Sequence, residues 1–128
     1  MKLTLRLLAG ELSIVRLAAD AEVPSWFRFA AAPLSSITRT AHELSIVCGS
    51  AEVPGGVRCE IAFRAFVVEG ALDFSATGIL SGLLNPLADA GISIFSISTF
   101  DTDYILVRVA SLQAATSALR EKFVVIGD

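Results

Sequence analysis

Two kinds of hydrophobic pattern divide the chain. Before residue 59, short apolar stretches that alternate with polar residues predict strands at 3–8, 11–18, 34–39 and 43–48. Pro24 and Pro33 bracket a segment rich in alanine and aromatic residues, for which we expect one short helix. The loop at 52–56 contains Pro54, Gly55 and Gly56 and is the expected seam between two halves.

The second half adds helical periodicity. A long apolar strand is predicted at 59–69, and strands are also predicted at 92–99, 104–109 and 123–126. Apolar residues three and four apart predict a helix at 74–90, which Gly91 ends, and a second helix that follows an N-cap at Ser111. The order strand–helix–strand–strand–helix–strand predicts an α+β, ferredoxin-like βαββαβ unit whose helices cover one face of an antiparallel sheet.

We therefore expect two units, a reduced one at 1–58 and a complete one at 59–128. The 128 residues are 54 % hydrophobic and only 18 % charged, with a mean hydropathy of +0.69. A chain of this length buries about two thirds of its surface on folding. The apolar excess therefore predicts further burial against a partner, most simply in a homodimer.

Charge and hydropathy exclude several classes of protein. Ten basic and 13 acidic residues give a net charge of −3, which leaves no basic patch for nucleic acid. Uncharged stretches are shorter than the ~20 residues that a membrane helix needs, and charges interrupt the leucine-rich start, so we expect a cytoplasmic protein. Cys48 and Cys59 are expected to be free thiols, with a disulfide between them as the alternative.

Catalytic and metal-binding patterns are sparse. His42 is the only histidine and falls in a predicted turn, where we expect a surface or capping role. No cysteine–histidine cluster, phosphate-binding loop or nucleophile motif occurs, so we expect no catalytic residue, no metal and no cofactor. The Asp101 and Asp103 pair is open to two interpretations, solvated turn residues or acid–base carboxylates. We expect that the protein is not an enzyme.

Two polar segments stand out against this background. The segment 73–78 joins a strand to a helix, where backbone N–H groups and the helix dipole suit a carboxylate ligand, although plain helix capping explains the same residues. The segment 98–103 gathers polar groups after a strand, which is equally typical of an ordinary turn. Together they could provide donors for an anion and a carboxylate for a cation, as an amino-acid site requires.

Long stretches of the chain resemble a known family. The runs TGIL at 77–80, NPLADAGISIF at 85–95 and SISTFDTDYILV at 96–107 are similar to ACT domains of the CASTOR family of cytosolic arginine sensors and their small bacterial relatives. LSSITRT at 34–40 and ELSIV at 43–47 are similar to the N-terminal ACT-like unit of that family. The resemblance implies tandem ACT-like units that bind amino acids at the junction of paired domains.

By position, the resemblance implies ligand-binding residues in two groups. The first group is the ligand loop and helix start, formed by Asp73, Phe74, Ser75, Ala76, Thr77, Gly78, Ile79 and Leu80. The second group, at the strand end, is Thr99, Phe100 and Asp103, of which Asp103 would take the cationic end of the ligand. Ala76 replaces a carboxylate of the arginine sensors and Asp73 replaces a glycine, so the implied ligand is an amino acid or related metabolite rather than arginine specifically.

The resemblance supports two functions. The first is a non-catalytic regulatory sensor that binds a small metabolite near a homodimer interface and changes its contacts with a regulated protein. The alternative is a structural or protein-interaction ACT module with a degenerate, unoccupied pocket. Tightening of the 73–78 loop and Asp103 around a ligand would distinguish the first from the second.

Overall fold

The computed structural model describes residues 3–70 and 77–127. The chain forms two compact units, Gly10–Phe63, here called the strand unit, and Met1–Ala9 with Arg64–Asp128, here called the helical unit. This division differs from the expected boundary after residue 58, because the N-terminal strand groups with the C-terminal residues.

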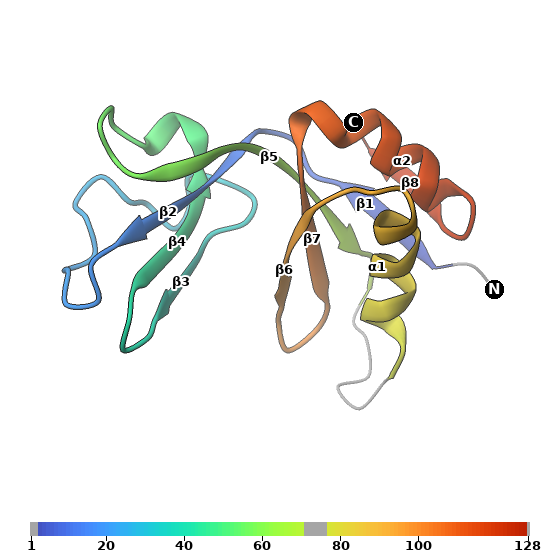
Figure 1. Ribbon diagram of the computed structural model, residues 1–128, viewed down its shortest axis with the longest axis horizontal. Coiled ribbons are helices and arrows are strands. Elements are labelled where there is room, and N and C mark those ends of the chain that lie inside the picture. The colour runs from blue at the N-terminus through green and yellow to red at the C-terminus, as the bar shows by residue number, and fades with distance from the viewer. Residues whose placement is uncertain (1–2, 71–76, 128) are drawn as a thin grey trace. The chain divides into compact units, whose positions relative to one another are not determined.

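The helical unit contains both helices (Figure 1). Its sheet has the strand order β6-β7-β5-β1-β8. The elements are β1 (Thr4–Leu7), β5 (Cys59–Val68, from Arg64 onward), α1 (Ile79–Asp89), β6 (Ile94–Ser98), β7 (Asp103–Arg108), α2 (Leu112–Arg120) and β8 (Val124–Gly127). From β5 onward, the predicted βαββαβ order is confirmed.

The N-terminal strand enters the sheet of the helical unit. Within β1, Leu5 pairs with Val68 of β5 in antiparallel register and with Val125 of β8 in parallel register. The expectation of a purely antiparallel sheet is therefore wrong, because β1 lies between the first and last strands of the βαββαβ unit.

Both helices bury an apolar stripe in the core of the helical unit. Leu83 and Leu87 of α1 and Ala115 and Leu119 of α2 are fully buried. They join side chains from the strands, which include Leu5, Phe66, Val68, Ile105 and Val107. Burial of this kind stabilises a domain by about 25 cal/mol per Å² of apolar surface.

The helix termini differ partly from expectation. Gly91 ends α1 as predicted, with φ +72° and a 2.9 Å bond from the Ile92 N–H to the Leu87 carbonyl. The Ser111 hydroxyl accepts no capping hydrogen bond from α2, and a 3₁₀ turn, η2 (Val109–Ser111), precedes that helix instead. The start of α1 is at Ile79 rather than residue 74, because Gly78 takes a left-handed conformation with φ +78°.

The strand unit is an antiparallel sheet in the order β3-β4-β2-β5. It comprises β2 (Leu12–Leu17), β3 (Ser36–Arg39), β4 (Leu44–Gly49) and the part of β5 up to Phe63, with the 3₁₀ turn η1 (Ser50–Glu52) after β4. Val15, Phe27, Leu44, Ile46 and Cys48 form its buried core.

The expected short helix between Pro24 and Pro33 is wrong. Two separate turns occupy this segment, closed by bonds from Phe27 N–H to the Pro24 carbonyl and from Ala31 N–H to the Arg28 carbonyl. The Arg28 N–H, which would bond the Pro24 carbonyl in a helix, donates to Glu52 Oε1 at 2.8 Å. The same carboxylate accepts the Gly49 N–H at 2.9 Å, so Glu52 fixes the segment in a non-helical form.

The two cysteines are free, so the alternative of a disulfide is wrong. Cys48 lies opposite Ser13 and Cys59 lies opposite Val15, which places β2 between them. Strands in a sheet are ~4.8 Å apart, so two strand spacings separate these residues by more than the ~7 Å that a disulfide spans. Burial, with the nearby Glu52 carboxylate, raises the pKa of the Cys48 thiol to about 11.

Candidate functional site

A tight turn joins β6 to β7 at one end of the sheet of the helical unit. Thr99 N–H donates to the Thr102 carbonyl at 2.8 Å, and Thr102 N–H donates to Thr99 Oγ1 at 3.2 Å. The turn therefore runs over 99–102, one residue earlier than the 100–103 gap between the predicted strands, because the Thr99 hydroxyl and backbone close it there. Asp103 becomes the first residue of β7 and takes a fixed place in the sheet.

Register places Asp103 directly opposite Ser98. Ser98 Oγ donates to Asp103 Oδ1 at 2.6 Å. Alternation puts both side chains on the sheet face of Ile105 and Val107, which is the face that the helices cover. Asp103 is half-buried there, and within the described residues no cation pairs with it. Among residues 3–70 and 77–127, no donor bonds its second carboxylate oxygen.

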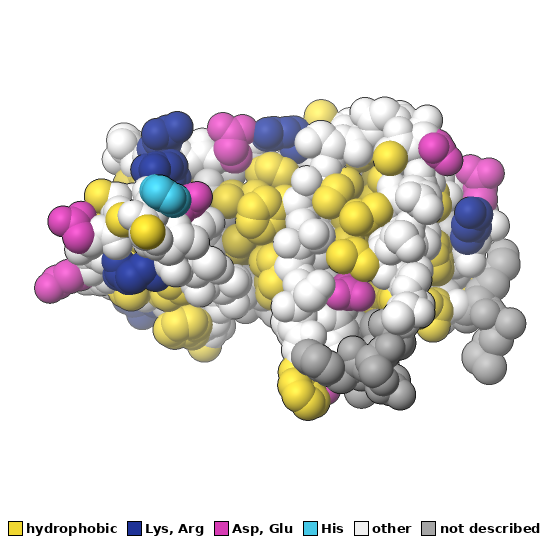
Figure 2. Space-filling model, turned by 60° about the horizontal axis from the view of Figure 1, so that its bottom comes forward, with side chains coloured by type: hydrophobic (Ala, Val, Ile, Leu, Met, Phe, Trp, Pro, Cys, Tyr) yellow, Lys and Arg dark blue, Asp and Glu magenta, His cyan; other side chains and the backbone are white. Residues whose placement is uncertain are grey.

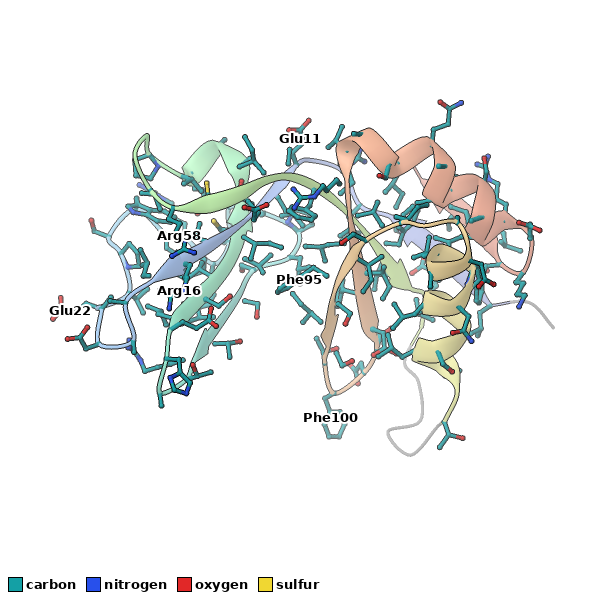
Figure 3. All side chains as sticks on the ribbon, viewed as in Figure 1. Glu11, Arg16, Glu22, Arg58, Phe95 and Phe100 are labelled. Carbon is teal, nitrogen blue, oxygen red and sulfur yellow. The ribbon has the colours of Figure 1, made fainter. Side chains whose placement is uncertain are left out.

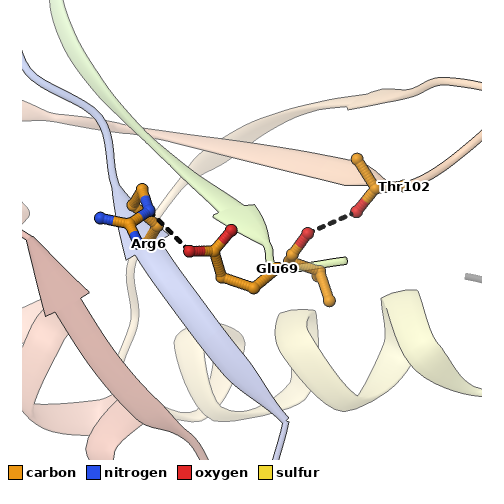
Figure 4. Close-up of polar contacts among 4 residues, drawn as sticks. Arg6, Glu69 and Thr102 are labelled. Carbon is orange, nitrogen blue, oxygen red and sulfur yellow. Dashed lines mark hydrogen bonds and ion pairs between the residues drawn. The ribbon is translucent and has the colours of Figure 1, made fainter. Parts of the chain in front are cut away.

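Two polar contacts hold this end of the sheet (Figure 4). Thr102 Oγ1 donates to the Val68 carbonyl at 2.9 Å, which joins the turn to the C-terminal end of β5. Next to Val68, Glu69 pairs with Arg6 of β1 at 2.6 Å, with both side chains more than a third exposed. An exposed pair of this kind contributes little to stability.

The first turn of α1 supplies backbone donors. Gly78 has no side chain to cap the helix, and no acidic residue lies in the first turn. The Gly78 carbonyl accepts the first helical bond, from Gly82 N–H at 3.0 Å, and also a bond from Ser81 Oγ. The N–H groups that open the helix therefore combine with the positive end of its dipole, which favours an anionic group.

The structure describes only part of the predicted site. In the helical unit, α1 begins at the end of the sheet where the 99–102 turn lies (Figure 1). Of the predicted residues, Thr77, Gly78, Ile79 and Leu80 lie at the start of α1, and Thr99, Phe100 and Asp103 lie in the turn and at the start of β7. The predicted residues Asp73, Phe74, Ser75 and Ala76 lie outside the described residues.

The remaining predicted residues have distinct surroundings. Phe100 is 77 % exposed at the tip of the β6–β7 turn, and its ring points away from the sheet (Figure 3). The Thr99 hydroxyl is engaged within the turn, where it also donates to the Thr102 carbonyl. Asp101 is exposed in the same turn, unlike Asp103.

Sequence reasoning missed Ser98 and Thr102. The available signal was strand alternation combined with turn length, because a turn at 99–102 pairs Ser98 with Asp103 automatically. His42 has the surface position that we expected, in the turn between β3 and β4, where its N–H donates to Thr40 Oγ1.

Surface charge and metal-ligand chemistry add little to the site. Figure 2 shows both acidic and basic side chains on the face in view. Among residues 3–70 and 77–127, no group of His, Cys, Asp and Glu has a geometry suited to a metal ion. No described helix combines the length and apolar character needed to cross a membrane.

Comparison with known sequences agrees with this architecture. The ACT domain family matches residues 58–121, and a family described as an N-terminal domain matches residues 10–56. The human protein CASTOR3P is 32 % identical over an alignment of 104 residues that covers 71 % of this chain. The chain spans 64 % of the length of that relative.

Solved structures show the same fold. Protein Atu0741 from Agrobacterium tumefaciens is 35 % identical, with a TM-score of 0.91 over 100 % of this chain and 95 % of that chain. The regulatory subunit of aspartate kinase from Thermus flavus has a TM-score of 0.58 at 10 % identity and covers 95 % of this chain and 97 % of that chain. The chain shares its fold with that subunit, and it belongs to the ACT domain family.

Proposed function

We propose that this protein is a non-catalytic sensor that binds an amino acid or a related small metabolite. The proposed site lies between the first turn of α1, at 77–80, and the strand-end residues Thr99, Phe100 and Asp103. We also include the adjacent loop residues Asp73, Phe74, Ser75 and Ala76 in the proposed site. Membership of the ACT family supports a regulatory role, and the half-buried Asp103 carboxylate is the observation that carries the site.

The chemistry of the two elements suits a zwitterion. Asp103 offers a carboxylate oxygen to a cation, and a charge-assisted hydrogen bond of this kind is about twice as strong as a neutral one. The opening N–H groups of α1 offer donors and a positive dipole end to a carboxylate. An amino acid carries both of these charges on one carbon atom, so it can satisfy both elements at once.

We further propose that the protein acts as a cytoplasmic homodimer, with the ligand near the contact between ACT units. Binding would change its contacts with a regulated protein. Strand β6 is an edge of the sheet in the helical unit, and the backbone groups on an open edge favour pairing with another strand. The 54 % hydrophobic composition supports such a contact.

The alternative function is a structural or protein-interaction module with an unoccupied pocket. The bonds within the 99–102 turn favour this reading, because Thr99 and Thr102 satisfy one another and Ser98 already bonds Asp103. A site that is satisfied internally does not need a ligand in order to be stable.

A thermal-shift screen of the full chain against the twenty L-amino acids distinguishes the two functions. A ligand at one hundred times its Kd stabilises the folded state by ~2.7 kcal/mol, which raises the melting temperature measurably. We expect at least one amino acid to stabilise the protein. No shift with any of them at millimolar concentration would favour the interaction module.

A further inference from the structure

We propose that Arg16 and Arg58 form a binding site for a phosphoryl group carried by a small metabolite. Both residues belong to the strand unit, so this site is separate from the amino-acid site proposed for the helical unit. The ligand class is a phosphate monoester, whose charge of about −2 at neutral pH matches the two guanidinium groups. The proposal is carried by the strand register, the absence of ion pairs at the two arginines and the neighbouring hydroxyl groups.

The two arginines lie directly opposite each other on neighbouring strands. Val15 of β2 pairs with Cys59 of β5 in antiparallel register, and the next pair along the strands is Arg16 with Arg58. A bond of 3.1 Å from the Arg16 N–H to the Arg58 carbonyl joins them. Residues paired in this way project to the same face, with Cβ atoms ~4.5–5.5 Å apart. Their exposed side chains therefore lie next to each other on the sheet (Figure 3).

This pair of positive charges has no anionic partner in the described part of the chain. Of residues 3–70 and 77–127, none forms an ion pair with Arg16 or Arg58. Arg16 Nη2 donates to the neutral His42 carbonyl at 3.0 Å, which orients the guanidinium group and uses only one of its several donors. Figure 2 shows basic side chains beside the single histidine. Because like charges directly opposite each other destabilise a sheet, an anion that binds both would be stabilising.

Hydroxyl groups continue the row across the sheet. Ser45 of β4 lies opposite Arg16, and Thr38 of β3 lies opposite Ser45. Paired residues share a face, so both hydroxyl-bearing side chains lie on the face of the arginines. Ser45 is half-buried, and its hydroxyl forms no hydrogen bond with a described residue. A phosphoryl group has three terminal oxygens, which can accept bonds from two guanidinium groups and a hydroxyl at once.

Acidic residues limit the size of the ligand. Glu43 lies two residues before Ser45, and Glu60 lies two residues after Arg58, so strand alternation places both carboxylates on the same face. Because the strands are antiparallel, the two carboxylates lie on opposite sides of the arginine pair along the strands. The positive charge therefore suits a single phosphoryl group. A nucleic acid or an anionic membrane would bring further phosphates against these carboxylates.

The experiment is a calorimetric titration of the full chain with glycerol 3-phosphate at neutral pH and constant ionic strength. D-Glycerate is the matched ligand, because it carries a singly charged carboxylate instead of the phosphoryl group. The variants are Arg58→Ala and Arg58→Lys, of which the second keeps the charge and loses the planar fork. Arg120→Ala is the matched control, because Arg120 is exposed at the end of α2 and forms no ion pair with a described residue.

We expect the wild type to bind glycerol 3-phosphate about tenfold more tightly than D-glycerate. Arg58→Ala is expected to weaken binding of glycerol 3-phosphate by about tenfold, Arg58→Lys to weaken it less, and Arg120→Ala to bind like the wild type. Without ligand, Arg58→Ala is expected to melt at the wild-type temperature or above it, because the substitution removes a like-charge pair. The melting curves also establish that each variant folds.

The proposal would be overturned if glycerol 3-phosphate at millimolar concentration did not bind the wild type, or bound it and Arg58→Ala equally. Equal affinity of the wild type for glycerol 3-phosphate and D-glycerate would overturn the phosphoryl assignment. A melting temperature of Arg58→Ala below that of the wild type would show that Arg58 already has a stabilising partner. Tighter binding of N-acetyl-O-phosphoserine amide than of glycerol 3-phosphate would overturn the assignment to a small metabolite and favour a phosphorylated protein. Amino-acid binding is measured separately, so this proposal and the proposed function can fail independently.

Discussion

At the residue scale, the buried Cys48 thiol makes stability depend on pH. Burial and the neighbouring Glu52 carboxylate raise its pKa from 9.0 to about 11. The folded state therefore keeps the thiol neutral over a range in which the unfolded chain ionises. The resulting stabilisation is complete below pH 9 and is lost as pH rises from 9 through about 11.

We expect the unfolding free energy of the wild type to fall by up to ~1.4 kcal/mol per pH unit more than that of Cys48→Ala across this window. Urea denaturation at several pH values between 8 and 11 measures both slopes. The comparison cancels other groups that titrate in the same range. Parallel slopes for the two proteins would show that Cys48 ionises equally easily when folded.

The Glu52 carboxylate also holds a segment predicted to be helical in a non-helical form. Glu52 accepts the Arg28 and Gly49 N–H groups, and these two bonds hold the 24–31 segment as turns. Hydrogen bonds to charged groups contribute ~1.5–3 kcal/mol each, and the exposed position of the Arg28 bond places the pair at the lower end of the combined effect. Glu52→Ala is therefore expected to lower the unfolding free energy by about 2 kcal/mol and to speed amide exchange at Arg28.

Glu52→Gln keeps one acceptor oxygen and is expected to lose less stability. Glu22→Ala is the matched control, because Glu22 is exposed in the same unit and forms no hydrogen bond with a described residue. Equal stability of the Glu52→Ala and Glu22→Ala variants in denaturant would contradict the structural role of Glu52.

At the scale of elements, local patterns predicted most of the fold. The periodicity from Cys59 onward identified every strand and helix of the βαββαβ order, because amphipathic periods of two and 3.6 residues are local properties. The place of β1 in the sheet was not predictable in this way. Alternation shows that 4–7 form a strand, whereas its partners, Val68 and Val125, are distant in sequence.

The sequence indicated which segments form the candidate site, but not which residues pair across the β6–β7 hairpin. The polar segment at 98–103 was visible in the sequence, but the exact turn was not. A turn at 100–103 and a turn at 99–102 have similar residue preferences, and only the Thr99–Thr102 bonds select the second. That choice decides whether Asp103 lies in a loop or opposite Ser98 in the sheet.

At the scale of the whole molecule, the proposed homodimer has a direct consequence for mass. Strand β6 forms an edge of the sheet in the helical unit, and the helix α1 directly precedes it in the chain. We expect light scattering at micromolar concentration to give twice the chain mass of 13.5 kDa. A constant mass near 13.5 kDa over this range would remove the dimer from the proposal.

Calorimetric titration of Asp103→Ala with the L-amino acid that stabilises the wild type most is the most direct test of the proposed sensor function. Removing one partner of a desolvated charge pair costs ~2–5 kcal/mol, so binding is expected to weaken more than tenfold. Asp101→Ala, at an exposed position in the same turn, and His42→Ala and Cys59→Ser, outside the site, are expected to bind like the wild type. Equal affinity of Asp103→Ala and the wild type would contradict amino-acid binding at this site.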